Sequence, residues 1–162
     1  MNKRRRYVPN LIADMAECDA NYIRLHRLFP HMADQDQLEF GVDANGQSGN
    51  QISSLTEDGA TVTISIVERC PYTTMMLVRV ASEEDKPWIR WPTLEVRVYH
   101  DIKSAEVVSF ERHRNFKFRY HTPNQKMFQP DEKSQINRYF GELLTFCYEH
   151  GHSLETVDVG RA

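Results

Sequence analysis

Apolar and polar residues alternate along much of the chain between residues 61 and 120. The clearest stretch is Leu94, Val96 and Val98, which alternate with Glu95, Arg97 and Tyr99. A period of two is typical of strands that turn one face to a core and the other to water. The pattern predicts strands at residues 61–66, 73–80, 94–99, 105–112 and 115–120, with shorter ones at 38–42 and 52–55.

Helical spacing occupies the two ends of the chain. After Asn10, a residue typical of an N-cap, apolar residues recur at steps of four and three until Pro30. A second helix is predicted from Asp131, as its N-cap, to Gly151. The predicted core stripes are Leu11, Met15, Cys18, Tyr22, Leu25 and Phe29 in the first helix, and Ile136, Phe140, Leu143 and Cys147 in the second. Together these elements predict an α+β fold, in which an N-terminal and a C-terminal helix pack on a meandering, mainly antiparallel sheet of five or more strands.

Chain length and the placement of turn-forming residues predict a single domain, 1–162. A chain of 162 residues is long enough for one core and short for two. We expect three segments outside this core: a basic flexible arm at 1–9, a mobile loop at 43–56 that is rich in Asn, Gly and Ser, and a flexible tail at 152–162.

The composition argues against several classes of protein. The formal net charge is −3 and hydrophobic residues make up 40% of the chain, values typical of a soluble globular protein. No apolar run approaches the roughly 18 residues of a membrane span, and no secretory signal follows the basic start. The spacing of Cys18, Cys70 and Cys147 indicates neither a disulfide framework nor a zinc site. We therefore expect a cytoplasmic protein without a membrane segment, a metal ion or a cofactor.

Several ordered blocks of residues resemble those of a known family. They are Arg69-Cys70-Pro71-Tyr72-Thr73-Thr74, Tyr99-His100-Asp101, Ala105-Glu106-Val107, Phe116-Lys117-Phe118-Arg119-Tyr120, Pro123-Asn124 and Asp131-Glu132-Lys133-Ser134-Gln135-Ile136-Asn137. Over residues 10–151 the chain resembles the YqiB-like family of small bacterial cytoplasmic proteins. The resemblance implies a bacterial cytosolic protein, and it supplies no catalytic residues because that family is uncharacterised.

The polar face of the predicted sheet is the candidate site. Five side chains share this face if the strands alternate as predicted, namely Glu95, Arg97, Tyr99, Lys117 and Arg119. No nucleophile elbow, phosphate-binding glycine loop or dinucleotide fingerprint occurs, so the sequence assigns no catalytic residue. Our leading hypothesis is a cytosolic binding or accessory module, without enzymatic activity, that engages a protein or an anionic ligand through this face. A solvated network of cross-strand charges explains the same residues without a binding function.

Two other functions stay open. Cations beside aromatic residues, together with the basic arm, are compatible with binding of RNA or single-stranded DNA; these cations are Arg112, Arg114, Lys117, Arg119 and Lys126. Strand alternation nevertheless predicts that Phe116, Phe118 and Tyr120 face the core. A cluster of His100, Asp101 and Glu106 is compatible with hydrolysis of a phosphate ester, although Asp101 is equally a turn former.

Overall fold

Two helices and six strands make up the part of the chain that the structure describes. This part of the computed structural model is residues 8–42, 60–82, 92–112 and 130–153. In chain order the elements are α1 (Leu11–Leu28), β1 (Gln37–Val42), β2 (Ala60–Arg69), β3 (Thr73–Ser82), β4 (Pro92–Tyr99), β5 (Ser104–Arg112), α2 (Pro130–His150) and β6 (Gly151–Ser153). The strands predicted at 52–55 and 115–120, residues 1–7 of the predicted arm and the predicted loop at 43–56 lie outside the described residues. Neither described helix has the length and apolar character needed to cross a bilayer.

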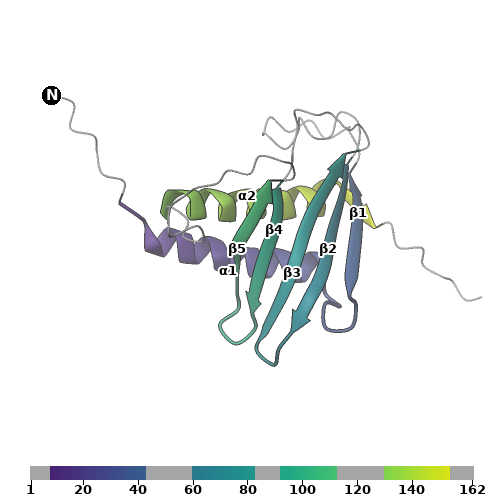
Figure 1. Ribbon diagram of the computed structural model, residues 1–162, viewed down its shortest axis with the longest axis horizontal. Helices are drawn as coiled ribbons and strands as arrows, with labels where there is room; N and C mark the ends of the chain where they lie inside the picture. The colour runs from purple at the N-terminus through teal and green to yellow at the C-terminus, as the bar shows by residue number, and fades with distance from the viewer. Residues whose placement is uncertain (1–7, 43–59, 83–91, 113–129, 154–162) are drawn as a thin grey trace, which may run out of the picture.

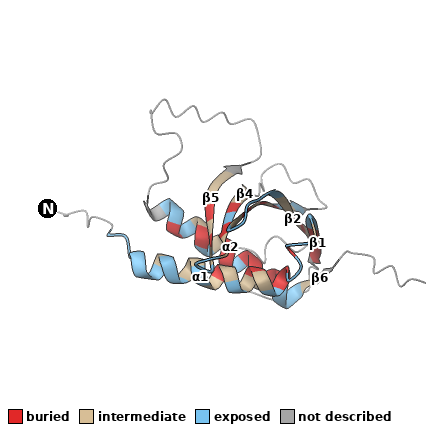
Figure 2. Cartoon of the chain, turned by 90° about the horizontal axis from the view of Figure 1, so that it is seen from below, coloured by how far each residue is buried: buried red, intermediate tan, exposed pale blue. Residues whose placement is uncertain are grey.

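The strands form one antiparallel sheet in the order β5-β4-β3-β2-β1-β6. From β1 to β5, each strand pairs with the one before it in the chain, which is the predicted meander (Figure 1). Both helices lie on the same side of this sheet and run across its strands (Figures 1 and 2). The predicted α+β fold is therefore confirmed, with β6 as an additional strand beside β1.

The alternation along the strands decides which side chains enter the core. The large apolar residues that β2, β3 and β4 bury share the face that the helices cover, and they are Val62, Ile64, Met76, Val78, Leu94, Val96 and Val98. A large aliphatic side chain that leaves water contributes about 1.5–3 kcal/mol. A slip of one residue in register would turn this whole set to solvent, so the apolar face fixes the orientation of the sheet.

Helix α1 begins where the sequence predicts, but only its second half is buried. The side chain of Asn10 accepts a hydrogen bond from the backbone N–H of Ala13 at 3.1 Å, as an N-cap residue does. Leu25 is fully buried, whereas Leu11 and Met15 of the same predicted stripe are 68% and 59% exposed. The first half of α1 extends beyond β5, the last described strand on that side of the sheet (Figure 2). Periodicity identified the apolar face of the helix, but it contained no information on how far the sheet reaches beneath it.

The C-terminal helix differs from its predicted limits at both ends. It begins at Pro130, so Asp131 lies inside the helix and is not the N-cap. Proline suits the first helical position because its fixed φ is helical and no N–H partner is needed there. After His150 the chain enters β6, where Gly41 pairs with His152 and Phe40 with Ser153. Residues 152 and 153 of the predicted tail are thus part of the sheet, while 154–162 lie outside the described residues.

Candidate binding site on the open face of the sheet

Strand β4 carries three of the predicted site residues on the face that no described helix covers. Glu95, Arg97 and Tyr99 alternate with residues that are fully buried, and Arg97 is exposed to solvent. Their shared face is the one that the sequence predicts. Lys117 and Arg119 lie outside the described residues.

Pairing with the neighbouring strands decides which residues surround Arg97. It lies opposite Met75 on β3 and opposite Glu106 on β5. Tyr99 lies opposite Thr73 on β3. Side chains directly opposite each other on one face approach within about 5 Å at Cβ. The antiparallel register therefore brings residues of three different strands into one group.

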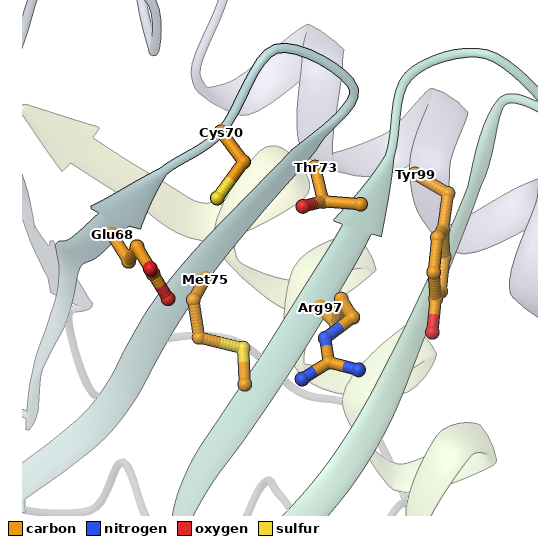
Figure 3. Close-up of a pocket in the computed structure, with 6 residues that line it drawn as sticks. All are labelled: Glu68, Cys70, Thr73, Met75, Arg97 and Tyr99. Carbon is orange, nitrogen blue, oxygen red and sulfur yellow. The ribbon is translucent and has the colours of Figure 1, made fainter.

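A shallow depression of about 220 Å³ lies within this group (Figure 3). It is lined by Glu68, Cys70, Thr73, Met75, Arg97 and Tyr99. Figure 3 shows Glu68 and Arg97 on either side of Met75, so a carboxylate and a guanidinium flank the thioether of Met75. An irregularity between Ile66 and Glu68 shifts the register of β2, which places Glu68 opposite Met75. The sequence analysis missed Glu68, Cys70, Thr73 and Met75 as site residues because bulges and cross-strand neighbours leave no signal in local periodicity.

Two carboxylates that share the face of Arg97, those of Glu95 and Glu106, are engaged by other groups. The Tyr99 hydroxyl donates to Glu106 Oε1 at 2.9 Å, and Lys133 Nζ of α2 lies 3.0 Å from Glu106 Oε2. The Ser109 hydroxyl donates to Glu95 Oε2. Arg97 itself makes no ion pair with any residue that the structure describes.

Tyr99 stays a neutral hydrogen-bond donor in this arrangement. Burial, followed by its hydrogen bond to Glu106, raises the pKa of the Tyr99 hydroxyl above its ordinary value, while Arg97 opposes part of this rise. The hydroxyl therefore stays protonated at neutral pH. Among these residues, Arg97 supplies the positive charge and Glu68 an exposed negative charge.

Arg69 is the last residue of β2, just before the turn that leads into β3, and its side chain stabilises the fold. Arg69 Nη1 lies 2.7 Å from Asp36 Oδ1, and Nη2 donates to the carbonyl oxygens of Met32 at 3.1 Å and Gln35 at 2.7 Å. One guanidinium thus holds the segment between α1 and β1 against the end of β2. The backbone N–H of Cys70 donates to the carbonyl oxygen of Thr73 at 2.8 Å and closes the turn.

His100 joins the tips of the two hairpins. Its Nε2 lies 2.8 Å from the buried hydroxyl of Thr74, and its backbone N–H donates to the carbonyl oxygen of Tyr72 at 2.8 Å. Two of the segments that carry the family resemblance, 69–74 and 99–101, therefore meet beside the depression. Among the described residues, no hydrogen bond joins His100 to Asp101 or Glu106. The described part of the chain contains no set of three or more His, Cys, Asp or Glu arranged to hold a metal ion.

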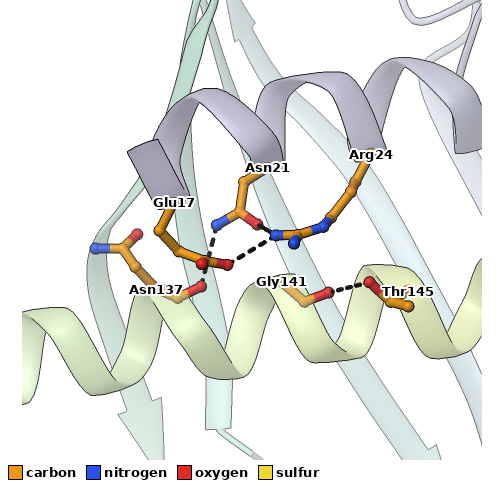
Figure 4. Close-up of polar contacts among 6 residues, drawn as sticks. All are labelled: Glu17, Asn21, Arg24, Asn137, Gly141 and Thr145. Atoms are coloured by element: carbon orange, nitrogen blue, oxygen red, sulfur yellow. Dashed lines mark hydrogen bonds and ion pairs between the residues drawn. The ribbon is translucent and has the colours of Figure 1, made fainter. Parts of the chain in front are cut away.

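A second group of polar residues lies between the helices and supports the fold (Figure 4). Asn21 Nδ2 on α1 donates to the carbonyl oxygen of Asn137 on α2 at 3.0 Å. Asn137 Oδ1 in turn accepts from the backbone N–H of Val107, at the outer edge of β5, at 2.8 Å. These buried contacts link both helices to the edge strand, and each satisfies a group that would be costly to bury alone.

Comparison with known proteins places the chain in a family. The model of a family described as "Protein of unknown function (DUF1249)" matches residues 24–153. The chain belongs to this family. It is similar to the uncharacterised protein YqiB of Escherichia coli, in strain K12 and in the O6:H1 and O157:H7 strains, with 33% identity over 147 residues, which cover 91% of this chain and 94% of YqiB. The resemblance predicted from the sequence is thus confirmed, and no solved structure matches the chain.

Proposed function

We propose that this chain is a binding module that receives an acidic side chain of a protein partner at Arg97, on the open face of its sheet. The observation that carries the proposal is an exposed guanidinium at a depression, without an ion pair among the described residues, beside Glu95 and Glu106, whose carboxylates are engaged elsewhere. Arginine forms paired, planar hydrogen bonds with carboxylates, and it is enriched among the residues that dominate protein interfaces.

The size of the depression favours a protein partner over a small cofactor. Pockets for small molecules usually enclose about 300–1,000 Å³, whereas this one holds about 220 Å³ and is open to solvent. Such a space fits one side chain of a partner. The thioether of Met75 and the ring of Tyr99 supply apolar surface for its aliphatic part, and polarisable methionine adapts to different shapes.

We also propose that the protein acts in the cytoplasm. Cys18, Cys70 and Cys147 are free thiols, and Cys70 is exposed at the depression. A reducing compartment keeps such exposed thiols from oxidation. The separations along the chain and the absence of a disulfide among the three both support this location.

The test compares two arginines of the same sheet face. Partners are captured from a bacterial lysate with the immobilised chain, identified by mass spectrometry, and titrated as purified proteins against wild type and variants. Arg97→Ala should weaken binding by roughly 30-fold, which corresponds to about 2 kcal/mol. Arg79→Ala is the matched control. Arg79 is exposed on β3, and it lies four residues after Met75, so the alternation of the strand places both on the same face. Its effect should be small, and Arg97→Lys should retain part of the affinity.

Two outcomes would overturn this proposal. Equal losses in Arg97→Ala and Arg79→Ala would show attraction by overall charge and not a specific contact at Arg97. Capture of RNA or single-stranded DNA, with an affinity that falls steeply as salt rises, would favour phosphate binding instead.

A further inference from the structure

Three residues on neighbouring strands place opposite charges on either side of a thioether. Glu68 on β2 lies opposite Met75 on β3, and Met75 lies opposite Arg97 on β4. Glu68 and Arg97 are exposed, and all three residues line the depression on the open face of the sheet (Figure 3). We call these three residues the charged row. Because adjacent strands lie about 4.8 Å apart, the charged row carries its carboxylate and its guanidinium at equal distances from Met75.

The charged row is complementary to itself under a two-fold rotation. Consider two sheets packed face to face, with a two-fold axis that runs along β3 between them. This axis carries β4 of one copy over β2 of the other, so Arg97 of each copy meets Glu68 of the other and Met75 meets Met75. Such a pairing, in which residue i contacts j and j contacts i, is the property of an isologous dimer interface. Packed sheets lie about 10 Å apart, a distance that an arginine and a glutamate side chain together span.

The charges also select this axis over the other one that face-to-face packing allows. An axis across the strands would keep β2 over β2 and β4 over β4. It would therefore bring Arg97 onto Arg97 and Glu68 onto Glu68, and like charges placed against each other cost several kcal/mol. Only the axis along β3 pairs unlike charges, and it leaves the strands of the two sheets aligned, which is a common arrangement of packed sheets.

The next row along the strands agrees with the same axis. Leu77 of β3 lies between Ser65 of β2 and Glu95 of β4. The rotation brings Leu77 onto Leu77 and Glu95 of each copy onto Ser65 of the other. Ser109 donates to Oε2 of Glu95, and Oε1 of Glu95 is a second acceptor for the Ser65 hydroxyl. Half-buried apolar side chains thus meet on the axis, and donors meet acceptors beside it.

The open face of β2–β5 is large enough to support such a dimer. These strands contain 10, 10, 8 and 9 residues. At about 4.8 Å between strands and about 3.4 Å per residue, they cover a flat area of about 500–600 Å². Protruding side chains raise the accessible surface above this figure, so the face approaches the roughly 800 Å² that each partner buries in a typical stable interface.

We infer that a second copy of this chain docks on the open face, with Glu68 of each copy bound to Arg97 of the other. The inference rests on the proposed function and names the acidic side chain that Arg97 receives. A different protein at Arg97 is the competing occupant.

Charge reversal tests the inference on the purified full chain, with self-association measured by sedimentation velocity over a series of concentrations. Wild type should form a dimer. Arg97→Glu and Glu68→Arg should each weaken the dimer by more than about 100-fold, because each replaces two attractive contacts with two contacts between like charges. An equimolar mixture of these two variants should form a heterodimer within about tenfold of the wild-type affinity, because positions 97 and 68 then carry opposite charges at both contacts.

Arg79 provides a matched control on the same face. It is exposed on β3, the strand that follows the axis, so it would lie nearest to its own copy. Arg79→Glu therefore exchanges one pair of like charges for another, and it should change the dimer affinity by less than about threefold. Mixed with Arg97→Glu, it should restore no association.

Three results would overturn the inference. The first is a wild-type chain that stays monomeric at about 100 μM. The second is a dimer that neither charge reversal weakens, since another surface would then form it. The third is a mixture of Arg97→Glu and Glu68→Arg that associates no better than either variant alone. If wild type is monomeric but Arg97→Ala still loses a captured protein, the second copy is rejected and the proposed function stands.

Discussion

Replacing Gly141 by alanine sets two physical effects of opposite sign against each other. Gly141 lies in α2, where it faces α1 across a close contact (Figure 4). A Cβ built at this position would meet Glu17 Oε1, and would lie 2.6 Å from Arg24 Nη1 and 2.7 Å from Asn21 Oδ1. Real Cβ atoms do not approach other atoms so closely, so these side chains would have to move.

The three displaced side chains differ in what their movement costs. Glu17 and Arg24 form an ion pair at 2.7 Å with partly exposed side chains, so its loss costs only about 0.2–1 kcal/mol. Asn21 is fully buried, and its amide donates to the carbonyl oxygen of Asn137, so it has no free space to enter. Overpacking of this kind costs about 1–3 kcal/mol. Alanine in place of glycine stabilises a helix by about 1 kcal/mol. We therefore expect Gly141→Ala to lower the free energy of unfolding by about 1–2 kcal/mol.

Urea unfolding followed by circular dichroism measures this change, with the free energy extrapolated linearly to water. The Glu17→Ala background is the control, because it removes the side chain whose atom lies nearest to the new Cβ. Gly141→Ala should destabilise that background less than it destabilises wild type. A gain of about 1 kcal/mol in the wild-type background, as helix propensity alone predicts, would refute the argument from close contact.

Two further changes act at other buried polar groups. Asn137→Ala should cost about 1–3 kcal/mol, because the buried N–H of Val107 loses its acceptor; hydrogen exchange at the Val107 amide should become faster, and unchanged protection would contradict this role. His26 should make stability depend on pH. Burial, and less strongly the nearby His100, lowers the pKa of the His26 ring below the ordinary 6.5. The Nε2 atom of His26 is also buried with no hydrogen-bond partner among the described residues. The unfolded chain then binds the proton first, so this contribution is complete above about pH 6.5 and is lost as the pH falls below that value. Wild type should lose more unfolding free energy than His26→Gln between about pH 7.5 and about pH 5.5, and equal losses would exclude His26 as the cause.

The sequence predicted the α+β class, the meander and the orientation of β4 correctly because these depend on local patterns. A strand exposes alternate residues on opposite faces whatever its neighbours are, so Arg97 and Tyr99 were assigned to the correct face. The N-cap at Asn10 was equally local, since it needs only a side-chain acceptor within three residues. β6 was missed because three residues are too few for a periodic signal, and pairing with β1 alone makes them a strand.

The rest of the candidate site was not predictable because register joins residues that are distant in the chain. A shift in β2 brings Glu68 opposite Met75, and pairing of β3 with β4 brings Met75 opposite Arg97. Neither contact has a counterpart in composition or spacing. The ion pair of Glu106 also depends on tertiary structure, because Lys133 reaches this carboxylate from α2.

By itself the sequence determined which segments are helices and strands and which side of each is apolar, since backbone sterics and the transfer of side chains from water act residue by residue. Only the tertiary structure decided which of those apolar sides are covered and which polar groups meet. It buried Leu25 and left Leu11 of the same stripe exposed, because the extent of the sheet beneath a helix is set by strands elsewhere in the chain. It likewise left Arg97 without an ion pair among the described residues, while Glu106 pairs with Lys133 and Tyr99 and Glu95 accepts from Ser109.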